Sequence, residues 1–298
     1  MAQSPNLFDR DLLRARRARA AALGPATFLL DRVAAELSER LSVVLRKFEL
    51  AVDLGTPGGV VRHALESVVG TLIAVDAQPE LRGERAPLFV AADLEALPFR
   101  DGVFDLAVSA LALQFVNDLP GALTQIRRAL RADGLFLAVL IGGLSLGELR
   151  ESFAEAEAEI EGGASPRVAP FVDVRELGAL LQRAGFALPV TDIDRLTVRY
   201  ASPLALMHDL RRMGATNVLA ERRRLPLRRA TLRRMMEIYG ERFADADGRV
   251  RATFEIVWLS GWAPHEGQQK PLAPGSAKMR LADVLGAREI SAGEKARR

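Results

Sequence analysis

Residues 50–60, which read LAVDLGTPGGV, constrain the fold more than any other stretch of this chain. A short apolar run ends in an acid, and a glycine-rich turn leads into a helix-compatible segment from Val60 to Val69. This pattern is typical of a buried parallel strand that passes through a tight loop into a helix. In open α/β sheets, ligands bind outside the carboxyl ends of the strands. The stretch therefore predicts a ligand site at this turn, although glycine-rich turns also occur for purely steric reasons.

Two further apolar runs end in an acid in the same way. Residues 71–76 end at Asp76, at about the distance of 20 residues where such folds bind ribose hydroxyls, and residues 88–93 end at Asp93. Three carboxylates at one edge of a sheet indicate a polar ligand there. The alternative for each acid taken singly is that it caps the N-terminus of the following helix.

The rest of the chain alternates between strand and helix patterns as far as residue 141. We expect strands at 50–54, 72–76, 88–92, 104–109 and 135–141, and a last strand at 253–259. We expect helices at 7–23, 28–45, 119–130, 146–161 and 174–184, extended segments at 188–200, and an Arg-rich helical insertion over 203–243. This alternation predicts an α/β fold with a mostly parallel sheet.

The composition excludes several kinds of site. The chain has no cysteine, so zinc–thiolate sites, Cys-ligated clusters and cysteine nucleophiles are absent, and its three histidines are too scattered to indicate a metal site. A net charge of +3 gives no reason to expect a nucleic-acid partner. No apolar run approaches the ~20 residues of a membrane span.

The N-terminus allows two interpretations. Between Arg10 and Arg19 it holds five arginines and one acid, with Ala and Leu between them. Such a segment resembles a mitochondrial presequence, but it also fits an amphipathic helix that packs over a ligand site. We favour the second interpretation, for a reason that comes from a family resemblance.

Several motifs, in this order along the chain, resemble those of class I S-adenosylmethionine-dependent methyltransferases. They are Asp53-Leu54-Gly55, Asp76, Asp93, Leu97-Pro98-Phe99 and Phe104-Asp105-Leu106. The resemblance implies a Rossmann-like sheet that is mostly parallel, with the 253–259 strand antiparallel beside the fifth strand, plus the helical insertion. It also implies S-adenosylmethionine as cofactor.

Other segments are more narrowly similar to the methyltransferase-like assembly factor of mitochondrial respiratory complex I and its bacterial relatives. They are Phe8-Asp9-Arg10, residues 115–120, 161–166 and 180–186, and His265-Glu266. In those relatives Phe8-Asp9-Arg10 opens the mature domain, which leaves little room for a presequence. We therefore expect a bacterial cytoplasmic protein, with the mitochondrial matrix as the alternative.

The resemblance implies roles for particular residues at the strand ends. Gly55 and Gly59 would line the methionine end of the cofactor, and Asp53 belongs to the same motif. Asp76 would accept hydrogen bonds from the ribose hydroxyls. Two adjacent residues, Asp93 and Leu94, would meet the adenine. Ser109 would face the sulfonium. No catalytic acid, base or nucleophile stands out, which is compatible with methyl transfer because that displacement mostly needs positioning.

Pro57 departs from the family pattern Asp-x-Gly-x-Gly-x-Gly, because it takes the second glycine position. Proline has no N–H group and fixes φ near −65°. Either Gly58 supplies the turn along a shifted path, or the affinity for the cofactor is reduced.

The expected organisation and function follow from these observations. N-terminal helices (1–46) cover the cofactor site, followed by the cofactor-binding core (47–201), the insertion (202–249), the final core strand (250–263) and a tail (264–298).

The leading hypothesis is a methyltransferase-like enzyme that acts on a protein, such as a complex I subunit. The alternatives are an arginine hydroxylase on the same fold, a carrier-protein or small-molecule O-methyltransferase, and a non-catalytic assembly scaffold.

Overall fold

A computed structural model of the chain describes residues 6–81, 88–269, 279 and 285–287. Met1–Pro264 forms one compact unit and His265–Arg298 is a second. Within the second unit, residues 265–269 contain a turn in which the backbone N–H of His265 donates to Gln268 Oε1 at 3.1 Å. Most of the tail predicted for 264–298 lies outside the described residues.

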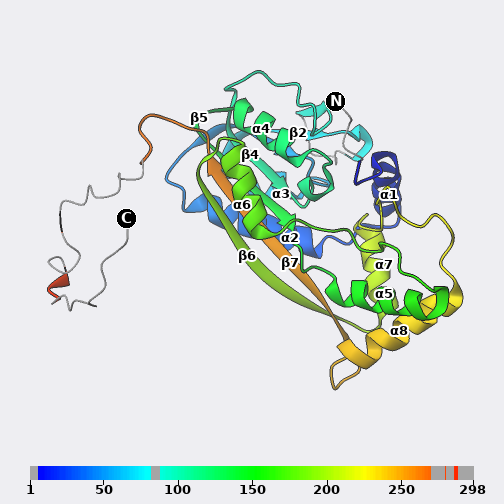
Figure 1. The fold of residues 1–298 in the computed structure, drawn as a ribbon. Helices are drawn as coiled ribbons and strands as arrows, with labels where there is room; N and C mark the ends of the chain where they lie inside the picture. The colour runs from blue at the N-terminus through cyan, green and yellow to red at the C-terminus, as the bar shows by residue number, and fades with distance from the viewer. Residues whose placement is uncertain (1–5, 82–87, 270–278, 280–284, 288–298) are drawn as a thin grey trace. The chain divides into compact units, whose positions relative to one another are not determined.

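One seven-stranded sheet runs through the first unit in the order β3-β2-β1-β4-β5-β7-β6 (Figure 1). The strands are β1 (Phe48–Leu54), β2 (Val69–Asp76), β3 (Phe89–Ala91), β4 (Phe104–Ala110), β5 (Leu130–Ile141), β6 (Ala187–Tyr200) and β7 (Val250–Trp262). The first five are parallel, β7 is antiparallel to β5, and β6 is antiparallel to β7. The predicted fold class is thereby confirmed, including an interior β1 and an antiparallel β7 beside β5.

The helices are α1 (Arg10–Ala22), α2 (Phe28–Ser42), α3 (Val60–Leu65), α4 (Leu119–Ala129), α5 (Gly147–Glu161), α6 (Val174–Arg183), α7 (Pro203–Arg212) and α8 (Arg229–Phe243). Buried residues of α2, α3, α5, α7 and α8 share one core cluster, while those of α4 and α6 belong to another. The two clusters take alternate residues of the same strands, so they lie on opposite faces of the sheet.

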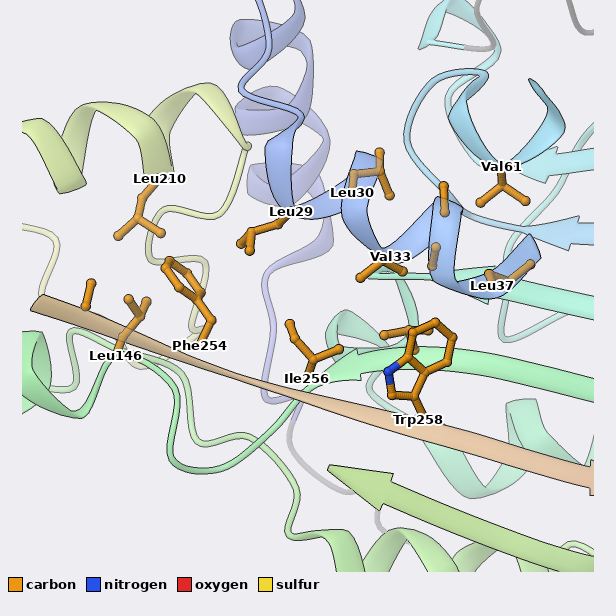
Figure 2. Close-up of a cluster of buried hydrophobic side chains, with 14 of the residues drawn as sticks. Leu29, Leu30, Val33, Leu37, Val61, Leu146, Leu210, Phe254, Ile256 and Trp258 are labelled. Atoms are coloured by element: carbon orange, nitrogen blue, oxygen red, sulfur yellow. The ribbon is translucent and has the colours of Figure 1, made fainter. Parts of the chain in front are cut away.

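Strand β7 illustrates this alternation. Ile256 and Trp258 contribute to the cluster with α2, whereas Val257 contributes to the other. Figure 2 shows Leu29 and Val33 on the side of α2 that faces these β7 side chains. Helix α2 thus packs on the sheet, and its first turn places Leu29 and Leu30 beside the cavity described below.

The predicted helical insertion over 203–243 consists of two helices with an irregular segment between them. Helix α7 ends at Arg212, and residues 213–228 are irregular until α8 begins. Gly214 takes a positive φ of 71° directly after α7, and Pro226 lies before α8. Both residues interrupt helices. Arginine has a high helix propensity, which made the segment look more regular than it is.

None of the helices that the structure describes is both long and apolar enough to cross a membrane.

Candidate functional site

The strand-end acids lie at one edge of the sheet, as their positions in the sequence predict. Asp53 and Asp76 belong to the neighbouring strands β1 and β2, and Asp93 follows β3, which pairs with β2. A cavity of about 1050 Å³ is lined by both Asp53 and Asp76. The candidate site is therefore the carboxyl edge of the first three strands.

Asp53 is buried, with 4% of its surface exposed. Burial disfavours the charged form and raises the pKa of its carboxyl to about 7, even though the hydroxyl of Thr56 donates to it. The two side-chain oxygens are 2.5 Å apart. The same Thr56 oxygen accepts the backbone N–H of Ala110 at 3.0 Å. A threonine in the glycine-rich loop thus joins β1 to β4 beneath the site.

Asp76 forms an ion pair with an arginine of the N-terminal helix. The Arg17 Nη1 atom lies 3.0 Å from Asp76 Oδ2, and its Nη2 atom donates to the carbonyl oxygen of Gly55 at 3.1 Å. The other Asp76 oxygen accepts the backbone N–H of Gln78 at 2.9 Å. Arg17 therefore connects the two positions predicted to bind the ribose and the methionine end of the cofactor.

A second arginine of the same helix binds the third acid. The Arg10 Nη2 atom lies 2.5 Å from Asp93 Oδ1, and Nη1 lies 3.3 Å from Glu95 Oε1. Partial burial raises the pKa of Asp93, but the Arg10 guanidinium and the backbone N–H of Glu95 outweigh it and hold that pKa below its ordinary value. Sequence reasoning missed Arg10 and Arg17, although the arginine-rich pattern of residues 10–19 was the available signal.

The glycine-rich loop turns at two positions with positive φ. Gly55 has φ +74°, and a Cβ atom there would lie 2.7 Å from Leu94 Cδ1, so the loop needs glycine at this point. Gly58 has φ +71° with open space around it, directly after Pro57. Gly59 is the N-cap residue of α3. The backbone therefore makes its second turn at Gly58, one position beyond the proline.

Ser109 does not point to where the sequence placed it. Its hydroxyl donates to the carbonyl oxygen of Leu54 at 2.7 Å, and none of its surface is exposed. Of the residues predicted to bind the cofactor, Asp53 and Asp76 line the cavity, whereas Gly55, Gly59, Asp93, Leu94 and Ser109 do not. Its hydroxyl therefore joins β4 to the end of β1, and the expectation that it faces the sulfonium is corrected. The cause is that its carbonyl partner lies on the adjacent strand.

The cavity extends from the strand ends into an apolar chamber. Beyond the acids its lining comes from α2, α5, α7 and β7, and includes Leu29, Leu149, Phe153, Met207 and Phe254. Its volume is at the upper end of the ~300–1,000 Å³ that single-ligand sites span. A cavity of this kind has room for a cofactor and part of a second molecule.

The chemistry of this edge fits S-adenosylmethionine. Carboxylates are good acceptors for the ribose diol, the adenine amino group and the methionine ammonium group. The positive-φ glycines permit a close approach of the backbone. No cluster of potential metal ligands occurs in the described part of the chain. The carboxylates and positive-φ glycines of this edge therefore suit the cofactor.

Comparisons with known proteins agree with this geometry. A family model described as a methyltransferase domain matches residues 52–138, a range that contains Asp53, Asp76 and Asp93. The structure resembles that of a candidate methyltransferase from Bacillus halodurans C-125, with a TM-score of 0.54 and 18% identity over 76% of this chain and 99% of that one. These matches confirm the methyltransferase fold.

Curated relatives extend the similarity to nearly the whole chain. The mitochondrial arginine-hydroxylase NDUFAF5 of Danio rerio is 39% identical over 291 residues, or 95% of this chain and 90% of the relative. Its human counterpart is also 39% identical, over 94% of this chain and 83% of the relative. A malonyl-[acyl-carrier protein] O-methyltransferase of Halorhodospira halophila is 35% identical over 86% of this chain and 87% of that protein.

Proposed function

The chain belongs to the family of the arginine-hydroxylase NDUFAF5, and from that premise we propose that it binds S-adenosylmethionine and acts on an arginine side chain of a protein partner. The observation that carries this proposal is the cavity that joins Asp53 and Asp76 to an apolar chamber. A site for the cofactor alone would not need that second compartment.

In this proposal each strand end holds one part of the cofactor. Asp76 accepts the ribose hydroxyls, while Asp93 and Leu94 meet the adenine. Asp53, Gly55 and Gly59 surround the methionine end. The side chain of Asp76 is 13% exposed and is paired with Arg17. The ribose hydroxyls therefore either displace Arg17 from the Asp76 carboxylate or bind that carboxylate together with Arg17. Helices α1 and α2 cover the bound cofactor, and the chain's own contribution is orientation and the exclusion of water.

The reaction is either methylation or hydroxylation of the arginine. S-adenosylmethionine supplies a methyl group when bound, and methyl transfer needs little more than alignment. Hydroxylation inserts one oxygen atom into a carbon–hydrogen bond. With O2 as the oxidant, the second oxygen atom leaves as water and takes up two electrons and two protons from an external reductant, so both reagents come from outside this chain. We favour hydroxylation, because two relatives that are 39% identical over 95% and 94% of this chain carry that activity in their names.

The protein partner that we propose is a subunit of respiratory complex I, as the resemblance drawn from the sequence implies. The proposed setting is the bacterial cytoplasm, with the mitochondrial matrix as the alternative because the animal relatives are mitochondrial.

The test compares complex I subunits from cells that express the wild-type chain, cells that lack it, and cells with Asp76→Ala. Mass spectrometry of their arginine-containing peptides is expected to show one added oxygen atom only with the wild-type chain. An added methyl group would instead identify the reaction as methylation. Unmodified subunits in all three strains, while the purified chain binds S-adenosylmethionine in calorimetry, would contradict an action on these arginines.

A second candidate is a carrier-protein O-methyltransferase, which the Halorhodospira relative favours. Transfer of a methyl group from labelled S-adenosylmethionine to a malonyl carrier protein would support it over the arginine proposal. A non-catalytic scaffold is the third candidate, motivated by Pro57. Undetectable binding at millimolar S-adenosylmethionine would favour the scaffold.

A further inference from the structure

Two residues that line the cavity each carry a buried side-chain oxygen atom with no hydrogen-bond partner among the described residues. These atoms are Gln114 Oε1 and Thr216 Oγ1. A buried polar atom without a partner lowers the stability of the protein that carries it. Such atoms in a cavity wall therefore indicate a ligand that satisfies them.

The orientation of the Gln114 amide follows from its other contact. Its Nε2 atom donates to the carbonyl oxygen of Leu111 at 2.8 Å. A carbonyl oxygen can only accept, so the nitrogen must face Leu111 and the amide oxygen is the free end. Leu111 itself has a φ of +53°, a conformation rare for a non-glycine residue. The strained turn after β4 thus fixes an acceptor at the cavity wall.

Thr216 lies on a segment that packs against the segment of Gln114. The N-terminal residues 8 and 9 lie between them: the N–H of Phe8 donates to Asn117 Oδ1 at 2.8 Å, and the N–H of Asp9 donates to the carbonyl oxygen of Val218 at 2.8 Å. Phe115 packs against the hydrophobic cluster formed by Phe8, Val218 and Leu219. Residues 8 and 9 therefore connect the two segments that carry Gln114 and Thr216, and Gln114 and Thr216 both line the cavity.

We propose that Gln114 and Thr216 are substrate-positioning residues that accept hydrogen bonds from a guanidinium group. This inference rests on the proposed function, and it names the residues that would recognise the arginine. A guanidinium group offers five N–H donors in a planar fork and is weakly hydrated, which suits an apolar chamber. The partly buried ring of Phe115 also lines the cavity and adds an aromatic surface that favours a cation.

The arginines that line the cavity favour a carboxylate ligand less strongly than the free oxygen atoms favour a guanidinium group. Arg17 is paired with Asp76, and Arg212 donates to the carbonyl oxygen of Gly24. Arg167 is paired with Glu157, whose side chain is fully buried. Arg211 is exposed. Of the two unsatisfied oxygen atoms, Gln114 Oε1 can only accept a hydrogen bond and therefore selects a donor, while the Thr216 hydroxyl can accept one as well as donate one.

The binding test uses protein saturated with S-adenosylhomocysteine and three small probes in NMR titrations. The probes are the N-acetyl methylamides of arginine, norleucine and glutamate. We expect the arginine probe to bind more tightly than the other two. Thr216→Val is expected to weaken the arginine probe at least ~10-fold, because a hydrogen bond to a charged group is lost. Gln114→Met should also weaken the binding of the arginine probe, and neither variant should change the binding of the norleucine probe.

Thermal unfolding of the unliganded protein supplies a second readout. Thr216→Val removes an unsatisfied buried oxygen, so its Tm should stay level or rise by about 1–3 °C. Thr231→Val is the matched control, because the Thr231 hydroxyl is fully buried but donates to Glu161 Oε1 at 2.6 Å. That variant should lower the Tm.

Three outcomes would overturn this inference. They are equal binding of the arginine and norleucine probes, preference for the glutamate probe, and unchanged arginine binding in Thr216→Val. Each of them can occur while the wild-type chain still binds the cofactor. Failure of the wild-type chain to bind the cofactor would instead contradict the proposed function, so the two failures are distinguishable.

Discussion

At the scale of single residues, Asp53 is the side chain whose chemistry is most altered by the fold. Burial raises the pKa of its carboxyl from 3.8 to about 7. The folded chain therefore holds this proton over a pH range in which the unfolded chain has lost it. The free energy of unfolding should consequently fall as the pH rises from about 4 to about 7, and Asp53→Asn should remove this contribution.

The raised pKa leads to a prediction about cofactor binding. At pH 6 the Asp53 carboxyl is mostly protonated, and a cationic group of S-adenosylmethionine beside it would favour the charged form. Binding should then release up to one proton near pH 6 and almost none at pH 8.5. Calorimetry in buffers with different ionisation enthalpies measures this release. Asp53→Asn is the control, and a release that persists in it would assign the proton to another group.

Asp76 leads to a second prediction at this scale. Asp76→Ala should weaken S-adenosylmethionine binding by about 1.5–3 kcal/mol, the range for hydrogen bonds to a charged group. The dissociation constant from calorimetry checks this, with circular dichroism to show that the variant is folded. An unchanged dissociation constant would remove the ribose role.

Arg17 provides the companion variant, since it occupies Asp76 in the free chain. Arg17→Ala frees the carboxylate and should tighten cofactor binding by a factor of about 2–5, the value of a modest ion pair. Arg14→Ala is the matched control, because Arg14 is on the same helix but pairs with the exposed Asp11. Weaker binding in Arg17→Ala would show instead that Arg17 contacts the cofactor.

At the scale of elements, the loop between β1 and α3 combines a proline with three glycines. Gly58 already makes the positive-φ turn beyond Pro57. Pro57→Gly should therefore change cofactor affinity by no more than ~3-fold, because it leaves that turn in place. Gly58→Ala should weaken binding ~5-fold, because an L side chain at this φ costs about 1 kcal/mol. Equilibrium binding of S-adenosylmethionine to both variants is the measurement. Binding that appears only in Pro57→Gly would overturn the enzyme proposal.

The same elements show what the sequence could predict. The apolar runs that form β1, β2, β4 and β5 were recognisable because a buried parallel strand is apolar on both faces. The acids that end β1 and β2 followed directly, since parallel strands bring their carboxyl ends to one edge. The irregular segment 213–228 was not recognised, because its arginines have a high helix propensity and its contacts lie elsewhere in the chain.

Local sequence patterns cannot predict which acids the arginines of α1 contact. Arg17 and Asp76 are 59 positions apart, and Arg10 and Asp93 are 83 positions apart. Helical periodicity shows that a helix can pack, but it does not show which acid each arginine meets. The position of Ser109 was mistaken for a similar reason, because its hydrogen-bond partner is the carbonyl group of a neighbouring strand.

At the scale of the whole molecule, the N-terminal segment connects parts that are far apart in the chain. Residues 7–9 pair with the irregular segment between α7 and α8, where Phe8 bridges Leu219. Arg10 then reaches the loop after β3. Helix α1 continues past the cavity and packs beside α7 (Figure 1). The segment thus joins the insertion to the sheet around the candidate site.

Asn117 anchors this segment to the connection between β4 and α4, and its removal gives the last prediction. Its side chain accepts the N–H of Phe8 at 2.8 Å and donates to the carbonyl oxygen of Phe8 at 3.2 Å. Asn117→Ala should therefore loosen α1, and trypsin should cleave at the α1 arginines several-fold faster than in the wild type. Asp118→Ala is the control, because Asp118 caps α4 by accepting the N–H of Gly121 at 2.9 Å and does not hold Phe8.

S-adenosylmethionine extends this experiment to the site. If α1 covers the bound cofactor, adding the cofactor should slow cleavage within α1, because proteolysis follows the population of the open form. The protection should be smaller in Asn117→Ala, where the helix has lost its anchor. Equal cleavage rates in Asn117→Ala and Asp118→Ala would show that Phe8 is not held through Asn117. Cofactor binding without any protection of α1 from cleavage would show that this helix does not cover the bound cofactor.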